Sequence, residues 1–171
     1  DPSGLLSGLS GWYDSGDVVT LSEPLAYILG NGTRLLFKSY DIYLTGTELS
    51  NLVINNTARI SINSPYTVIV NWTRQYLVII HSKYPVSING TETTNLTGWF
   101  YRGEELVVAP ATVFSNGLFL SEPGLNITVN KPLNVDIRWS INYDLTVLTY
   151  LPLIIIITII TMYITRKHHK Y

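Results

Sequence analysis

An uninterrupted run of 21 uncharged residues, 145–165, constrains this chain more than any other feature of its sequence. As an α-helix the run would be about 31 Å long, which matches the ~30 Å hydrocarbon core of a bilayer. The alternative is a helix buried in a soluble core, but no polar face interrupts the run and a basic cluster follows it. The sequence therefore predicts one transmembrane helix that serves as an anchor in the lipid bilayer.

The charges on the two sides of this segment differ in sign. Residues 1–144 carry all 12 acidic side chains against 8 Lys and Arg, whereas the tail 166–171 adds only Arg166, Lys167 and Lys170. By the positive-inside rule the tail lies in the cytoplasm or inside an envelope, and the N-terminal body lies outside. The weakly charged body argues against nucleic-acid binding, and the lack of cysteine excludes a disulfide framework and a thiolate metal site.

The outer part contains an internal repeat. Residues 11–16 resemble residues 98–103 at an offset of 87, and residues 60–76 resemble residues 127–143 at an offset of 67. The tryptophans of the chain all lie on this repeat: Trp12, Trp72, Trp99 and Trp139. Their recurrence predicts core packing, with an exposed sugar-stacking or interface platform as the alternative.

Within the repeat the apolar period is two, as in β-strands. The pattern predicts strands over 58–62, 66–72, 75–81, 127–129 and 133–139. Asn31-Gly32, Asn89-Gly90 and Asn116-Gly117 are turn signals between such runs. We expect an all-β fold of two tandem small antiparallel, Ig-like β-sandwich units, 1–74 and 75–144, followed by the transmembrane helix 145–165 and the basic inner tail 166–171.

Three segments together carry a resemblance to a known family. Residues 71–78 (NWTRQYLV), 82–85 (SKYP) and 98–100 (GWF) with Gly103 resemble the tandem β-repeat of archaeal secreted and surface proteins, including thermopsin-like proteins. The resemblance covers nearly all of residues 4–144. It implies an exported β-sandwich module of an archaeal envelope, and it implies no particular activity, because such repeats accompany many functions.

The start of the sequence departs from this repeat. A strand precedes the second Gly-Trp-aromatic turn, but only the Gly- and Ser-rich residues 1–10 precede Gly11, and no export signal is present. We expect the first unit to lack its opening strand because the chain is the C-terminal product of a precursor cut before Asp1; removal of a signal peptide is the alternative. A strand of the released fragment, or of a neighbouring subunit, would then complete the open sheet edge.

The outer part also carries an excess of glycosylation sequons. The candidate acceptors are Asn31, Asn55, Asn71, Asn89, Asn95 and Asn126. Glycans would shield a surface with few charges. The alternative is that these sequons arise from Thr-rich strands and Asn-rich turns, and Asn71 and Asn126 qualify only if their side chains point out of their strands.

No catalytic constellation is expected in this chain. The Asp14-Ser15-Gly16 sequence is similar to the catalytic turn of aspartic proteases, but its repeat counterpart at residues 101–103 has no carboxylate. His81 is the only histidine before the membrane segment, and Glu104 and Glu105 are interpreted as solvated turn charges. The sequence thus predicts no enzyme, no cofactor and no metal site.

These features favour a membrane-anchored structural or adhesive stalk of an archaeal envelope, on a cell surface or an enveloped virion. The expected partners are the bilayer and other envelope proteins within an oligomeric assembly. The alternative function is a non-catalytic accessory subunit of a membrane enzyme or protease complex.

Overall fold

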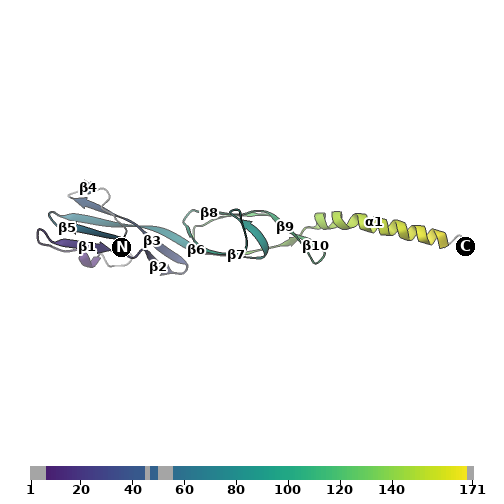
Figure 1. Ribbon diagram of the computed structural model, residues 1–171, viewed down its shortest axis with the longest axis horizontal. Coiled ribbons are helices and arrows are strands. Elements are labelled where there is room, and N and C mark those ends of the chain that lie inside the picture. Colours follow the sequence, from purple (N-terminus) through teal and green to yellow (C-terminus); the bar gives the residue numbers. More distant parts are fainter. Residues whose placement is uncertain (1–6, 45–46, 50–55, 169–171) are drawn as a thin grey trace. The chain divides into compact units, whose positions relative to one another are not determined.

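The computed structural model describes residues 7–44, 47–49 and 56–168 (Figure 1). The described chain is mostly β, with several antiparallel sheets and one long C-terminal helix, α1 (Tyr143–His168). The expectation of a β-rich body followed by a single apolar helix is therefore confirmed.

Two compact units make up the chain, and each is described by itself. One comprises Asp1–Ile79, Thr97–Glu105 and Thr128–Asn134, and the other comprises Ile80–Leu96, Leu106–Ile127 and Val135–Tyr171. These units are not consecutive in sequence. The predicted division between residues 74 and 75 concerns the two copies of the repeat, and it stays a prediction.

The first part of the chain forms a short 3₁₀ turn and a set of antiparallel strands. In order these are η1 (Ser7–Leu9), β1 (Val18–Ser22), β2 (Ala26–Gly30), β3 (Thr33–Leu44), β4 (Thr47–Leu49), β5 (Thr57–Ser61) and β6 (Tyr66–Ile88). β1 and β5 form a two-stranded sheet, whereas β3 pairs with β2, β4 and β6.

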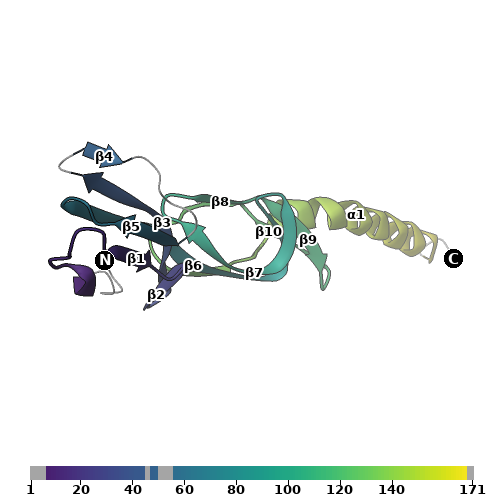
Figure 2. The ribbon, with the colours of Figure 1, turned by 60° about the vertical axis from the view of Figure 1, so that its left-hand side comes forward.

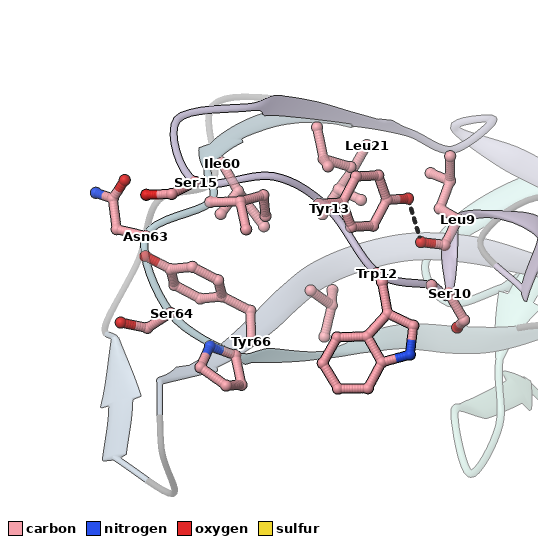
Figure 3. Close-up of a pocket in the computed structure, with 15 residues that line it drawn as sticks. Leu9, Ser10, Trp12, Tyr13, Ser15, Leu21, Ile60, Asn63, Ser64 and Tyr66 are labelled. Carbon is pink, nitrogen blue, oxygen red and sulfur yellow. Dashed lines mark hydrogen bonds between the residues drawn. The ribbon is translucent and has the colours of Figure 1, made fainter.

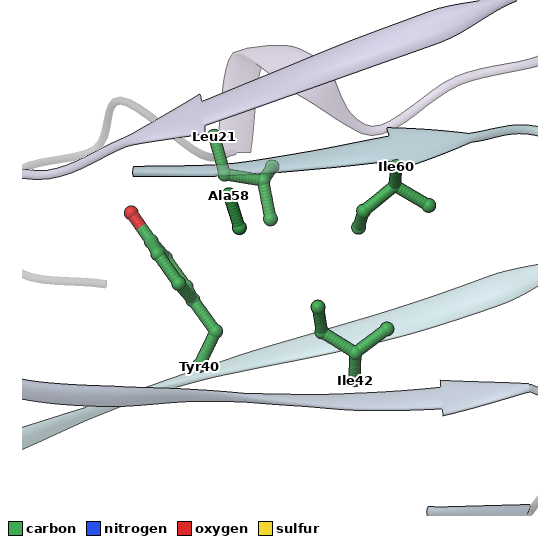
Figure 4. Packing of buried hydrophobic residues seen from close by; sticks show 5 residues of the cluster. All are labelled: Leu21, Tyr40, Ile42, Ala58 and Ile60. Atoms are coloured by element: carbon green, nitrogen blue, oxygen red, sulfur yellow. The ribbon is translucent and has the colours of Figure 1, made fainter. Parts of the chain in front are cut away.

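The core of the first compact unit lies between these two sets of strands. Leu21 on β1 and Ala58 and Ile60 on β5 face Tyr40 and Ile42 on β3 (Figure 4). Buried and exposed residues alternate along β5, as the period of two requires. Full burial of a Leu or Ile side chain contributes about 1.5–3 kcal/mol, so this small cluster is the main apolar support for the β1–β5 pair.

The remaining strands follow in the order β7 (Thr91–Tyr101), β8 (Glu105–Val108), β9 (Ala111–Ser115), β10 (Leu118–Glu122), β11 (Leu125–Thr128), β12 (Leu133–Ile137) and β13 (Ser140–Ile141). β10 lies between β9 and β13, and β8 lies between β11 and β6. β7 and β12 also pair with β6.

β6 differs from the expectation of separate strands over 66–72 and 75–81. It runs without a break for 23 residues, because Thr73 and Arg74 supply no turn chemistry and both pair with β3. The predicted Asn-Gly turns are confirmed. Both residues of each turn have positive φ, from 48° to 82°, as a two-residue hairpin of type I′ requires.

The internal repeat is visible in the hydrogen bonds. Gly16 N donates to Ile62 O at 2.8 Å, and Ile62 N donates to Asp17 O at 2.7 Å. The second copy makes the same pair of bonds, at 2.8 and 2.9 Å, with Gly103, Glu104 and Val129 in the places of Gly16, Asp17 and Ile62. The two offsets found in the sequence therefore correspond to equivalent backbone positions.

One pairing of neighbouring strands also has the same register in the two copies, up to the start of the membrane segment. Leu35, four residues after Asn31, pairs with Arg74 in the first copy. Leu120, four residues after Asn116, pairs with Ile141 in the second, and Ile141 follows Arg74 at the offset of 67. Beyond Arg74 the chain continues as strand β6, whereas beyond Ile141 it becomes helix α1. The helix thus begins where a further copy of the repeat would continue.

Helix α1 contains one stretch, Tyr143–Arg166, that is long and apolar enough to cross a membrane, and none of it is buried. Asn142 caps its start, because Asn142 Oδ1 accepts a hydrogen bond from Leu145 N at 3.0 Å. Pro152 lies inside the helix. The hydroxyls of Thr149, Thr158 and Thr161 donate to carbonyls four residues earlier, so they need no other partner in lipid.

Candidate functional site

The turn at Asp14 is held by its own backbone and side chains. Asp17 N donates to Asp14 O at 3.1 Å, and Asp14 N donates to Asp17 Oδ2 at 3.0 Å. Tyr101 and Glu104 make the same two contacts in the second copy, at 3.1 and 2.8 Å. A carboxylate that accepts the backbone N–H of its own turn has a structural task at both places.

Other candidate polar residues are dispersed. The exposed His81 on β6 lies with its Nδ1 2.7 Å from Asn95 Oδ1 on β7. In the part of the chain that the structure describes, no group of three His, Asp or Glu side chains could hold a metal ion.

The sequon asparagines differ in accessibility. Asn31, Asn89, Asn95 and Asn126 are exposed, and Asn55 lies outside the described residues. Asn71 is half-buried, and its Nδ2 donates to Ser39 Oγ at 3.2 Å. The amides of two exposed acceptors also have partners: Asn95 Nδ2 donates to Thr94 Oγ1 at 3.3 Å, and Asn89 Oδ1 accepts from Val107 N at 2.8 Å.

Two of the repeat tryptophans pack in the same manner. Trp72 meets the ring of Phe37 edge-on, with centroids 5.9 Å apart, and Trp139 meets Tyr84 edge-on at 5.2 Å. Trp139 Nε1 also donates to Ser82 Oγ at 3.1 Å. Aromatic pairs of this geometry add to the stability gained by burial.

The other two tryptophans do not share one environment. Trp99 on β7 is half-buried, and the Arg34 guanidinium lies 4.7 Å from its ring centroid. Its counterpart Trp12 is 103% exposed. The expectation of core packing is therefore wrong for Trp12. The physical reason is that β7 pairs with β6, whereas residues 10–14 belong to no strand.

A groove of about 560 Å³ opens beside Trp12 (Figure 3). Its walls include Trp12, Tyr13 and Tyr66, and the core residues Leu21 and Ile60 reach into it. None of the 15 residues that line it is charged. The groove thus presents an uncharged, mostly apolar surface next to the buried core of this compact unit.

Strand β1 contributes Val19 and Leu21 to the lining of this groove, and one of its edges is open in the part of the chain that the structure describes. Among the described residues β1 pairs with β5 alone, whereas its counterpart β8 pairs with β11 on one edge and β6 on the other. In the second copy Ile88 pairs with Val108, and Ala109 N donates to Ser87 O at 2.9 Å. Within the described ranges, the outer edge of β1 is therefore open where the equivalent edge of β8 is paired, and the expected absence of an opening strand stays a prediction.

A second surface lies where the body meets the helix (Figure 2). Asn142 N donates to Phe119 O at 2.7 Å, and Phe119 N donates to Thr146 Oγ1 at 3.2 Å. A Cβ atom at Gly117 would lie 3.4 Å from the Tyr150 hydroxyl. The tip of the β9–β10 hairpin therefore lies beside the second turn of α1. Sequence reasoning missed this contact, because nothing in either segment marks the other as its neighbour.

The hairpin tip is apolar. Phe114 is 59% exposed and packs on Phe119 with ring centroids 5.0 Å apart, and Leu118 is 37% exposed. Residues 111–121 carry no charged side chain.

Comparison of the chain with protein-family models, with curated proteins and with solved structures finds no match.

Proposed function

We propose that the protein is a membrane-anchored structural or adhesive stalk, with its β-rich body outside the membrane and its basic tail inside. The observation that carries the proposal is the direct junction between body and helix. β13 ends at Ile141, Asn142 caps the helix, and α1 begins at Tyr143. Because the first helical turns also bond to β10, the base of the body is fixed to the anchor instead of being tethered by a flexible linker.

The β9–β10 hairpin supports this arrangement. Tyr150 lies about 10 Å along the axis from the helix start and about 8 Å inside the span predicted from residue 145. Phe114 and Leu118, exposed on the hairpin beside it, would then lie at headgroup depth, where aromatic and apolar side chains are favoured. The body would contact the bilayer through this hairpin in addition to the helix.

The finer features of the proposal rest on the sequence pattern. We interpret the two copies of the repeat as Ig-like β-sandwich units of the kind found in archaeal surface proteins, with glycans on the exposed sequons. The equivalent hydrogen bonds and registers of the two copies support this interpretation. The proposed location is the membrane of an archaeal cell or of an enveloped virion, with the N-terminal body outside and the C-terminal tail inside.

Purification of the native chain from its own membranes in a mild detergent tests the function. We expect a complex with surface proteins, in a fixed stoichiometry measured by native mass spectrometry, without multi-span enzyme subunits. A stable complex with multi-span redox or protease subunits would contradict the stalk and favour an accessory subunit instead.

A further inference from the structure

The open edge of β1 presents the same backbone groups that β8 uses to bind β6. Residues 17 and 23 bond to the two residues that flank β5, through the pairs Asp17 with Ile62 and Glu23 with Asn56. In an antiparallel ladder alternate residues point to opposite edges, so Thr20 and Ser22 direct their backbone groups away from β5.

The counterparts of Thr20 and Ser22, 87 residues later, are Val107 and Ala109. Val107 O accepts a hydrogen bond from Asn89 N at 2.9 Å, and Ala109 N donates to Ser87 O at 2.9 Å. The exposed Thr20 and Ser22 have no such partner among the residues that the structure describes.

In the second copy, the side chains of β6 beside β8 show which side chains the groove of the first copy would accept. Val86 and Ile88 on β6 are 2% and 4% exposed, in a core that also contains Leu106 and Val108. The counterparts of Leu106 and Val108 in the first copy are Val19 and Leu21, and both line the open groove. Among the described residues, no strand on the outer edge of β1 contributes the two apolar side chains that β6 contributes beside β8.

We propose that β1 binds, in antiparallel orientation, an extended strand of another polypeptide that carries apolar residues at alternating positions, as residues 86–89 of this chain do. The strand would bond to Thr20 and Ser22 and place its apolar side chains in the uncharged groove, in the manner of β-strand addition. β6 is not available for this role, because it already pairs with β3, β7, β8 and β12. This inference goes beyond the anchoring role and does not depend on it.

Disulfide trapping tests the site, because the chain has no cysteine of its own. The probe is a synthetic peptide that copies residues 79–90 with Asn89→Cys, added to the full chain with Thr20→Cys in lipid nanodiscs. The control chain carries Arg59→Cys, since Arg59 pairs with Thr20 but directs its backbone to the opposite edge of the sheet. Paired residues in such a ladder lie about 5.5 Å apart, within disulfide range.

We expect the peptide to form a disulfide with the Thr20→Cys chain ~10-fold faster than with the Arg59→Cys chain. A peptide of the same composition with Val86 and Ile88 moved next to each other should not show this preference. Equal rates at the two positions, equal rates for the two peptides, or preferential disulfide formation between two copies of the Thr20→Cys chain would overturn the proposal.

A proline pair provides a second measurement that separates binding from folding. Ser22→Pro removes the backbone N–H that faces the open edge of β1 and leaves the β1–β5 ladder intact. Thr57→Pro, the control, removes a backbone N–H on the opposite edge of β5 and also leaves the ladder intact. We expect the unmodified peptide to bind the Ser22→Pro chain ~10-fold more weakly, while the Thr57→Pro chain binds normally and both chains melt at similar temperatures. Equal binding to both folded variants would contradict the proposed edge.

Discussion

Trp12 and Trp99 show that one residue type at equivalent positions of a repeat can have opposite environments. Trp99 lies on a paired strand and under the Arg34 guanidinium, whereas Trp12 follows a 3₁₀ turn and is fully exposed. Large exposed aromatics are favoured in binding surfaces because they contribute much contact area when covered. Trp12 is therefore expected to become buried when a strand binds to β1, with a blue shift of its fluorescence that Trp12→Phe would remove.

Trp72 and Trp139 form a matched pair for a stability test. Both pack edge-on against another ring, but Trp139 Nε1 donates to Ser82, whereas Trp72 Nε1 is buried without a partner among the described residues. We expect Trp139→Phe to lower the free energy of unfolding by about 1 kcal/mol more than Trp72→Phe, because only Trp139 loses a hydrogen bond. Denaturant unfolding of the full chain in detergent measures the difference, and a larger loss for Trp72→Phe would contradict it.

Ionisation of the core residue Tyr40 makes the stability of the fold depend on pH in the alkaline range. Burial, with a smaller contribution from the nearby Glu23 carboxylate, raises the pKa of Tyr40 from 10.0 to about 12. The folded chain then holds a proton that the unfolded chain releases, so this contribution to stability is complete below pH 10 and is lost as the pH rises to about 12. We expect unfolding midpoints to fall over this window, and to fall less in the Tyr40→Phe chain. Equal declines in both chains would contradict the coupling.

At the scale of elements, the β9–β10 hairpin is the part of the body predicted to touch lipid. We expect the fluorescence of a Phe114→Trp chain to be quenched by lipids brominated near the headgroup, because this side chain is exposed beside the base of α1. Val107→Trp, at an exposed position on β8 with no contact to α1 in the structure, is the control. Each chain is compared with the unsubstituted chain, which has four tryptophans. Equal quenching of the two variants would argue against hairpin contact.

The strands and turns were largely predictable from sequence. Alternation along 58–62 and the Asn-Gly pairs indicated elements that the structure contains, because period and turn chemistry are local properties. The continuity of β6 was not predicted, because the expected boundary between the two copies falls at residues 74 and 75 in its middle, although no turn residue is found there. The difference between β1 and β8 in strand pairing among the described residues could be anticipated only by comparing the two copies. The groove and the outward direction of the backbone groups of Thr20 and Ser22 could be identified only from the structure, because they depend on the pairing of strands that are distant in sequence.

At the scale of the whole molecule, one chain carries two different means of attachment. The apolar helix α1 suits a bilayer, and the open edge of β1 suits a strand of another polypeptide. The junction between body and helix is short and is capped by Asn142. The proposed stalk would use both attachments to hold an assembly at a membrane.

Site-directed labelling in membranes tests the central claim, that the chain spans the bilayer once with its body outside. Single cysteines are introduced as Asn130→Cys in the body and Tyr171→Cys in the tail, and intact cells that export the chain are treated with a membrane-impermeant maleimide. We expect labelling of the Asn130→Cys chain in intact cells and of the Tyr171→Cys chain only after the membrane is opened. Labelling of the tail from outside, or release of the chain by alkaline carbonate, would contradict the account.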